Sequence, residues 1–421
     1  EDVGLEGTGY TAAMFEGQIF LGTNNGLFVQ PIDQNGLKNN RFELFPGSYG
    51  QVYNLSRIED QLILGHHRGA FHVKDQQLLK FHDMGSWKFI PTRIPGLILG
   101  GDYQGITYFQ MNRDTYSRTG RVEGFYESSR VMEYENDSVL WMTHGSKGAF
   151  RLVFNDSMQV TGEIRQFGIK NGFPSNDISV FSINDQLVFT AVDGIYNFNT
   201  EASSFNPNQF FNKWLGNKQV VFISSNGNDA IYYIQDNHMG MLIQESFGTY
   251  RVEKELFKHI NKFMNDDLPN ISIIDEENIL IGAKEGFIKF NPNKQFSSNS
   301  DFHVLLRSIE VQPSQDSSIF FDPSFLENFQ LNKNQSVKFH YAAPYFDGFE
   351  DIRYGFRLLP VDKNWSKWTS AGEKDYSFLS PGEYIFEIKA LNVYGEESPV
   401  TSFSFKVLKP WYTSNPAIVV F

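Results

Sequence analysis

The chain has 421 residues and a formal net charge of −13 at pH 7, and it contains no cysteine. The missing cysteines exclude a disulfide framework and thiolate metal sites, and the acidic balance without a run of Lys or Arg argues against nucleic acid as a partner. A chain of this length is too long for one ordinary hydrophobic core, so we expect two domains.

A short pattern recurs seven times in the first two-thirds of the chain. In each copy an apolar run reaches a small residue, a polar turn follows, and a glycine starts the next apolar run. These glycines lie 36 to 46 residues apart, at Gly26, Gly69, Gly105, Gly148, Gly194, Gly240 and Gly286. Repeats of this length with two evident strands predict a seven-bladed β-propeller with four strands in each blade. A glycine suits the hairpin of each copy because it adopts positive φ without a steric penalty.

Each blade is predicted to begin with an innermost strand just before its repeat. We place these strands at 10–15, 51–56, 88–94, 130–134, 178–183, 219–224 and 270–274, and outer strands at positions such as 41–45 and 121–126. The seventh copy has no evident outer strand, and an open blade edge would expose unpaired backbone. Either residues before Tyr10 or residues upstream of this sequence would then close the ring. We assign 1–293 to the propeller.

The turns between the second and third strands of all blades emerge on one face of a propeller, around the mouth of its channel. Their side chains combine hydrogen-bonding groups with a few aromatic rings, a combination that binds sugars. We predict a ligand-binding face from Asn24, Asn25, His66, His67, Arg68, Asp102, Tyr103, Gln104, His144, Lys147, Asp236, Asn237, His238 and Lys284. Hairpin turns are also polar because water surrounds them, and this alternative stays open for each residue.

No catalytic signature is present among the common nucleophile, phosphate-binding and zinc motifs. We therefore expect no catalytic residue, no cofactor and no metal in this region. His66 and His67 are the strongest metal candidates, but adjacent residues on an extended strand point to opposite sides, so we do not expect them to share an ion.

The repeat ends after Pro292, and the Ser-rich stretch 294–301 predicts a linker. Residues 302–409 contain about seven short alternating strands, which predict an immunoglobulin or fibronectin-III-like β-sandwich. Residues 379–384 resemble a tyrosine corner, in which a phenol hydrogen-bonds upstream backbone. The apolar tail at 416–421 is far too short to span a bilayer, and we interpret 410–421 as the start of a membrane-approach segment.

Two parts of the chain resemble domains that occur together in one family. The segment LGTNNGL at 21–27 resembles the two-component regulator propeller repeat. The segments YGFRL at 354–358, DYSFL at 375–379 and PGEY at 381–384 resemble the triple-tyrosine domain, with Tyr354, Trp365, Tyr376 and Tyr384 as its motif residues. We expect these tyrosines to fill and pin the sandwich core.

The resemblance implies the periplasmic sensor region of a membrane-anchored hybrid two-component system of Bacteroidetes. It implies an oligosaccharide or other small ligand, a homodimer formed through the sandwich, a membrane helix beyond the C-terminus, and a histidine kinase domain outside this chain. Three alternatives stay open: a helix-turn-helix transcription domain as the output, a carbohydrate-active propeller enzyme, and a protein-interaction scaffold.

Overall fold

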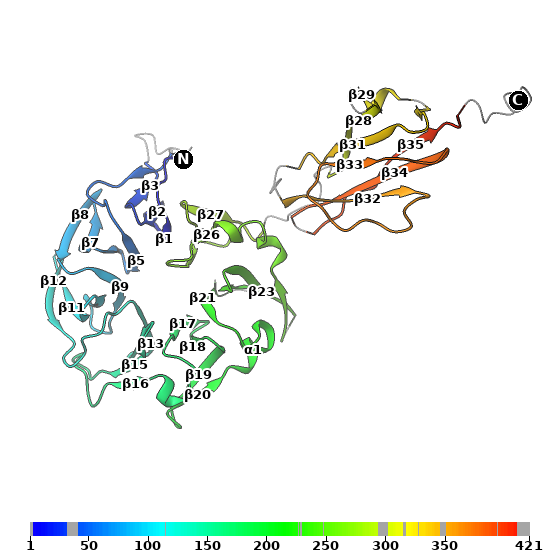
Figure 1. Ribbon diagram of the computed structural model, residues 1–421. Helices are drawn as coiled ribbons and strands as arrows, with labels where there is room; N and C mark the ends of the chain where they lie inside the picture. The colour runs from blue at the N-terminus through cyan, green and yellow to red at the C-terminus, as the bar shows by residue number, and fades with distance from the viewer. Residues whose placement is uncertain are drawn as a thin grey trace, which may run out of the picture. The chain divides into compact units, whose positions relative to one another are not determined.

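The computed structural model describes residues 3–31, 41–113, 115–225, 227, 230–246, 248–293, 302–314, 317–326, 328–345, 351–393 and 395–410. The chain separates into two compact units, Glu1–Lys294 (unit 1) and Gln295–Phe421 (unit 2), both built mainly of β-strands (Figure 1). The prediction of an all-β chain is confirmed. Of the predicted membrane-approach segment at 410–421, residues 411–421 lie outside the described part of the chain.

Unit 1 consists of antiparallel sheets that follow one another around a ring, which confirms the β-propeller prediction (Figure 1). We number the sheets in chain order. Sheet 1 contains β1 (Gly9–Phe15), β2 (Gln18–Thr23), β3 (Leu27–Val29) and β4 (Glu43–Leu44). Sheet 2 contains β5 (Val52–Ile58), β6 (Gln61–His66), β7 (Gly69–Lys74) and β8 (Gln77–His82). Sheet 3 contains β9 (Ser86–Pro91), β10 (Leu97–Asp102), β11 (Gly105–Asn112) and β12 (Thr115–Arg121).

The remaining sheets of unit 1 repeat this order. Sheet 4 contains β13 (Val131–Asn136), β14 (Val139–His144), β15 (Gly148–Val153) and β16 (Arg165–Phe167). Sheet 5 contains β17 (Ser179–Ile183), β18 (Gln186–Ala191), β19 (Gly194–Asn199) and β20 (Ser204–Pro207), and the helix α1 (Gln209–Leu215) follows it. Sheet 6 contains β21 (Val220–Ser225), β22 (Ala230–Gln235), β23 (His238–Ser246) and β24 (Thr249–Glu253). Sheet 7 contains β25 (Ile271–Ile273), β26 (Ile279–Gly282) and β27 (Phe287–Phe290).

Every predicted innermost strand overlaps the first strand of a sheet, but one predicted outer strand is wrong. The fourth strand of sheet 3 is β12, which ends where the predicted strand 121–126 begins. Val122 and Phe125 made that segment resemble a strand. Both side chains are buried in the core between sheets 3 and 4, together with Leu99 and Met132.

Gly240 does not close a hairpin as predicted. The turn of sheet 6 is formed by Asp236 and Asn237, whose φ values are 53° and 57°. Asp and Asn tolerate this left-handed conformation better than most residues do. Gly240 lies inside β23, where a Cβ atom would approach the ring of Tyr233 to 2.4 Å. Gly240 therefore leaves room for the ring of Tyr233. Gly69, in contrast, has a φ of 137° and provides the positive φ of its turn, as expected.

The ring closes where sheet 7 meets the first residues of the chain. Among the described residues sheet 7 has three strands, and the residues before Tyr10 do not add a fourth. Instead they cross the hairpin of sheet 7, where the Gly9 amide donates to the Ala283 carbonyl (2.9 Å) and the Gly286 amide donates to the Gly7 carbonyl (2.7 Å). The side-chain amides of Asn265 and Asn270 also donate to the Gly9 carbonyl, over 2.9 and 3.1 Å.

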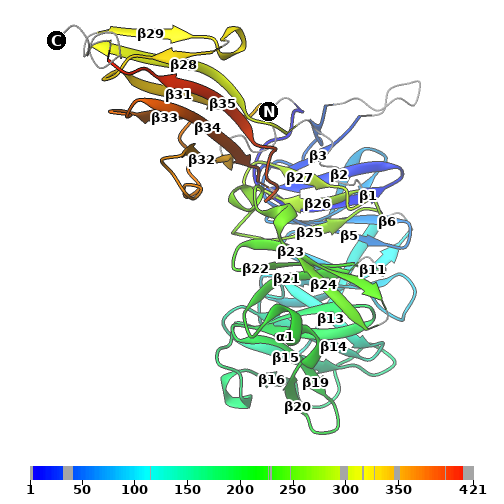
Figure 2. The ribbon, with the colours of Figure 1, turned by 90° about the vertical axis from the view of Figure 1, so that its right-hand side faces the viewer.

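Unit 2 is a sandwich of two four-stranded sheets, as predicted. One has the order β29 (Ser317–Phe321), β28 (Leu305–Ser314), β31 (Ser336–Ala342) and β33 (Glu373–Tyr376). The other has the order β30 (Gln330–Leu331), β35 (Thr401–Val407), β34 (Gly382–Leu391) and β32 (Arg353–Leu359), and β35 and β34 run side by side in Figure 2. The rings of Phe339 on β31 and Phe386 on β34 stack between the sheets with centroids 4.1 Å apart.

Candidate functional site

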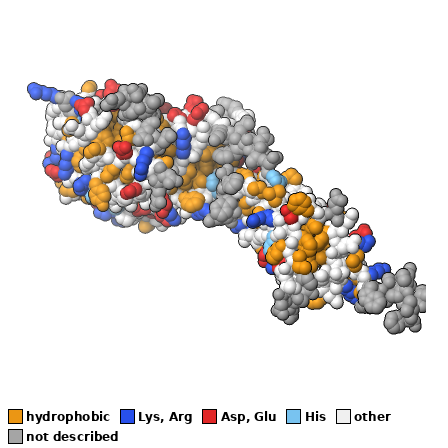
Figure 3. Space-filling model, turned by 90° about the horizontal axis from the view of Figure 1, so that it is seen from above, with side chains coloured by type: hydrophobic (Ala, Val, Ile, Leu, Met, Phe, Trp, Pro, Cys, Tyr) orange, Lys and Arg blue, Asp and Glu red, His pale blue; other side chains and the backbone are white. Residues whose placement is uncertain are grey.

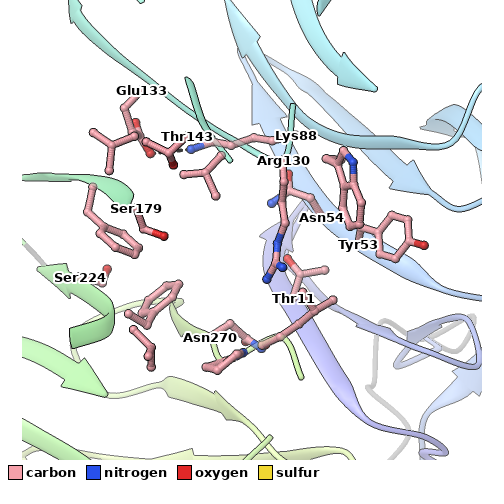
Figure 4. Close-up of a pocket in the computed structure, with 18 of the residues that line it drawn as sticks. Thr11, Tyr53, Asn54, Lys88, Arg130, Glu133, Thr143, Ser179, Ser224 and Asn270 are labelled. Atoms are coloured by element: carbon pink, nitrogen blue, oxygen red, sulfur yellow. Dashed lines mark hydrogen bonds and ion pairs between the residues drawn. The ribbon is translucent and has the colours of Figure 1, made fainter. Parts of the chain in front are cut away.

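The innermost strands of unit 1 surround a pocket of about 700 Å³ at the centre of the ring (Figure 4). Side chains alternate across a strand, so one set from each of these strands faces the pocket. Much of the lining consists of small polar groups that can donate or accept hydrogen bonds: Thr11, Asn54, Ser128, Thr143, Ser179, Ser182, Ser224, Asn270 and Ser272.

An aromatic cluster forms one part of the pocket wall. The rings of Tyr53 and Trp87 are stacked with centroids 4.1 Å apart. The Tyr53 hydroxyl lies 2.8 Å from the hydroxyl of Tyr103, and the indole N–H of Trp87 donates to Oγ of Ser128 over 3.1 Å. Burial, followed by the hydrogen bond with Tyr103, raises the pKa of Tyr53, so this phenol stays neutral at physiological pH. The opposite wall contributes the rings of Phe181 and Phe222, with centroids 5.5 Å apart.

Two cationic side chains line the pocket, and they differ in their contacts with neighbouring residues. Lys88 on β9 forms an ion pair with Glu133 on β13, with 2.6 Å between Nζ and Oε1. Arg130, directly before β13, is exposed and extends into the opening (Figure 4). Its guanidinium carbon lies 5.8 Å from the ring centroid of Trp87, within the range of a cation–π contact. The pocket therefore combines aromatic rings, hydroxyl and amide groups, and a guanidinium.

The face predicted from the hairpin turns overlaps this pocket only slightly. His144 lines the pocket, and Tyr103 reaches it indirectly through its hydrogen bond with Tyr53. The pocket residues that the prediction missed lie on or next to the innermost strands, whose positions the sequence indicates correctly. Whether any of the predicted turn residues binds a ligand stays a prediction.

Most of the other predicted residues make contacts within the protein. Ion pairs hold Lys147 to Glu127, Asp236 to Lys218, and Lys284 to Asp266. The side chains of Asn24, Arg68, Gln104 and His238 make hydrogen bonds, and Asn25 and Asn237 lie in the turns.

Asp102 is buried and serves the structure of sheet 3. Its carboxylate accepts hydrogen bonds from Thr107 Oγ1 (2.7 Å) and the Gln104 amide (2.8 Å) and forms an ion pair with Arg121. Burial acts to raise the pKa of Asp102. The nearby His82 ring, with Nε2 3.4 Å from Oδ2, and the hydrogen bonds from Thr107 and Gln104 outweigh burial and hold the pKa below its ordinary value.

His66 and His67 do not point to opposite sides, which corrects the sequence argument. Their ring centroids are 4.4 Å apart, because β6 ends at His66 and strand alternation no longer applies to His67 in the turn. His66 is fully buried: its Nδ1 accepts from the Arg68 amide, and its Nε2 lies 3.3 Å from the Ser48 carbonyl. In the part of the chain that the structure describes, no group of three His, Cys, Asp or Glu side chains is placed to hold a metal.

In unit 2 the tyrosines singled out in the sequence make hydrogen bonds within the sandwich. The Tyr384 hydroxyl donates to the Ser380 carbonyl over 2.6 Å, the bond expected of a tyrosine corner. The Tyr354 hydroxyl accepts from the Ala343 amide (3.1 Å), and the Tyr376 hydroxyl donates to Oδ2 of Asp362 (3.4 Å).

Residues 345–408 match the Y_Y_Y domain family. The match confirms the triple-tyrosine prediction, and the matched range contains Tyr354, Tyr376 and Tyr384. Trp365 is half-buried and has two cations near its ring, with Arg357 Cζ 4.6 Å and Lys389 Nζ 4.8 Å from the ring centroid.

Solved structures resemble the whole chain. One is the extracellular domain of BT3049 from B. thetaiotaomicron, assigned as a hybrid two component system, with 14% identity and a TM-score of 0.59 over 96% of this chain and 56% of that chain. Another is the extracellular domain of BT4673 from the same organism, also assigned as a hybrid two component system, with 14% identity and a TM-score of 0.50 over 96% of this chain and 57% of that one. At this identity the likeness shows the fold. The chain thus spans little more than half the length of these structures.

The sequence matches none of the curated proteins with which it was compared. Within the described residues, no helix has the length and hydrophobicity that crossing a membrane requires. On the face shown in Figure 3, acidic and basic side chains are interspersed.

Proposed function

We propose that this chain is the periplasmic ligand-sensing region of a membrane-anchored regulator of the hybrid histidine kinase type, and that it binds an oligosaccharide in the central pocket of unit 1. The Y_Y_Y domain match and the fold shared with extracellular domains of two-component systems support the sensor role. In this proposal residues 1–293 bind the ligand, the sandwich at 302–409 contacts a second copy of the chain, and 410–421 approach the membrane.

The composition of the pocket carries the ligand proposal. Oligosaccharides present hydroxyl groups in the ring plane and C–H groups on the ring faces. Serine, threonine and asparagine side chains from several sheets would bind the hydroxyl groups, and Tyr53, Trp87, Phe181 and Phe222 would contact the C–H faces. A pocket of about 700 Å³ is large enough for a small oligosaccharide.

Signalling in this proposal depends on differential affinity. A ligand can change the balance between two arrangements of the receptor only if it binds one of them more tightly, and coupling free energies of this kind are typically about 1–3 kcal/mol. A ligand that contacts several sheets of the ring at once is suited to favour one arrangement.

A thermal-shift screen of the purified chain against defined oligosaccharides tests the proposal. We expect at least one oligosaccharide to raise the melting temperature, and Ser224→Trp, which fills the pocket, to abolish the shift. Ser157→Trp, in an exposed turn outside the pocket, should retain it. A screen without any hit, or a hit that Ser224→Trp leaves unchanged, would contradict the proposal. Shortening of an oligosaccharide during incubation would support an enzyme instead.

A further inference from the structure

In the part of the chain that the structure describes, the guanidinium of Arg130 meets no hydrogen-bond acceptor. Among the described residues it makes no hydrogen bond and no ion pair. Its charged group contacts the ring of Trp87 in a cation–π arrangement. The carboxylate of Asp267 is close enough to interact with its charge. That carboxylate, however, already accepts a hydrogen bond from the Tyr10 hydroxyl over 2.7 Å.

The other ionisable side chains that line the pocket all have partners. Lys88 and Glu133 form an ion pair (2.6 Å), and Asp177 accepts a hydrogen bond from Nε2 of Gln219 (2.8 Å). His144 Nδ1 lies 3.3 Å from the Ser146 amide, which donates to it. Arg130 is thus the charged lining residue whose N–H donors are available to a ligand bound in the pocket.

A guanidinium has five N–H donors and no acceptor, and it stays charged at every physiological pH. Its planar fork matches a carboxylate or another oxyanion, with which it forms two parallel hydrogen bonds. Neutral hydroxyl groups fit this fork less well. The unpaired donor therefore selects for a ligand that carries an anion.

The surroundings of Arg130 determine what kind of anion fits. The stacked rings of Trp87 and Tyr53 lie next to the guanidinium, and small hydroxyl and amide side chains such as Thr11 and Asn54 complete this side of the pocket (Figure 4). This set suits a molecule that has an oxyanion, several hydroxyl groups and an apolar ring face at the same time. A free inorganic anion would leave the rings and the hydroxyl-binding groups unused.

We propose that the ligand is an acidic oligosaccharide and that Arg130 binds its sugar oxyanion, a carboxylate or a sulfate ester. This inference rests on the proposed function and adds the chemical class of the ligand and the residue that selects it. It also explains how a protein with a net charge of −13 accepts an anion, because the cation lies inside the pocket rather than on the outer surface.

Matched probes test this inference. Isothermal titration calorimetry would compare uronate-containing di- and trisaccharides with the same sugars after reduction of the carboxyl group, and sulfated disaccharides with their desulfated forms. We expect an acidic member to bind and its neutral counterpart to bind at least about tenfold more weakly, since charge-assisted hydrogen bonds to a guanidinium are lost. The comparison of uronates with reduced sugars tests for a carboxylate, and the comparison of sulfated with desulfated sugars tests for a sulfate ester.

Variants of Arg130 separate its role from a general effect of charge. Arg130→Gln should weaken the binding of the acidic sugar at least about tenfold, and Arg130→Lys should restore part of the loss. The exposed Arg118 on β12 provides the control, and Arg118→Gln should bind as the wild type does. Arg130→Gln should keep its fold, because Arg130 makes no hydrogen bond to any residue that the structure describes. Circular dichroism checks this.

Two other outcomes would overturn the inference without touching the proposed function. Binding of neutral sugars equal to that of acidic ones would refute an acidic ligand, and unchanged binding of an acidic sugar by Arg130→Gln would refute the role of Arg130. If no oligosaccharide of either kind binds, the proposed function itself fails.

Discussion

The hydroxyl of Tyr10 donates a hydrogen bond to Oδ2 of Asp267 over 2.7 Å, although the two residues lie 257 positions apart. Tyr10 is on the first strand of sheet 1, and Asp267 precedes the first strand of sheet 7. The bond therefore joins the two ends of the ring, and it does so beside the pocket. Burial and the hydrogen bond to Asp267 both raise the pKa of Tyr10, which keeps the phenol protonated as the donor.

Tyr10→Phe removes this link and should destabilise unit 1. A hydrogen bond to a charged acceptor contributes about 2 kcal/mol, and a domain of this size then melts about 3 °C lower. Differential scanning calorimetry measures the change. Tyr126→Phe is the control because Tyr126 is 71% exposed. Equal melting temperatures for the two variants would show that the hydroxyl of Tyr10 does not help to close the ring.

His66 should make the stability of unit 1 depend on pH. Burial, with smaller contributions from the His67 and Arg68 charges, lowers the pKa of His66 from 6.5 to about 4. The unfolded chain therefore binds this proton more readily than the folded chain does, so the stabilisation is present above pH 6.5 and is lost as the pH falls toward 4. The loss amounts to about 3 kcal/mol.

Denaturant titrations between pH 4 and 7 measure this effect. The stability of His66→Gln should fall less steeply with decreasing pH than that of the wild type. His238→Gln, which changes an exposed histidine, should retain the wild-type slope. A His66→Gln slope equal to that of the wild type would contradict the assignment.

The tyrosine corner of the Y_Y_Y domain should stabilise unit 2 and leave ligand binding unchanged. Tyr384→Phe removes the hydrogen bond to the Ser380 carbonyl and should destabilise unit 2 by about 1 kcal/mol. The affinity for an oligosaccharide should not change, since Tyr384 is a core residue of the sandwich. Phe378→Leu, at an 88% exposed position, is the stability control. A weaker affinity in Tyr384→Phe would indicate that this tyrosine takes part in sensing.

The fold is predictable from this sequence because its signals are local and repeated. An apolar run, a polar turn and a glycine define each hairpin, and the alternating residues before them define the innermost strands. The prediction failed at Val122 and Phe125, because apolar residues that are buried between two sheets have the same sequence pattern as a strand. It also failed at Gly240, because Asp236 and Asn237 form the turn that was assigned to this glycine.

The pocket was less predictable than the fold. Whether a residue faces the channel depends on the register and twist of each innermost strand, which the hairpin pattern does not report. Polar residues on or beside the predicted innermost strands, such as Thr11, Asn54 and Lys88, were the available signal. The role of Arg130 depends on its having no acceptor among the residues that the structure describes, and the three-dimensional arrangement is needed to recognise this.

The most direct measurement is a crystal structure of the chain with the oligosaccharide that gives the largest thermal shift. We predict a sugar ring in the central pocket of unit 1, beside Trp87 and Tyr53, with its oxyanion within hydrogen-bond distance of the Arg130 guanidinium. A sugar bound only to the hairpin turns or to the sandwich, with the pocket holding nothing but water, would contradict the account.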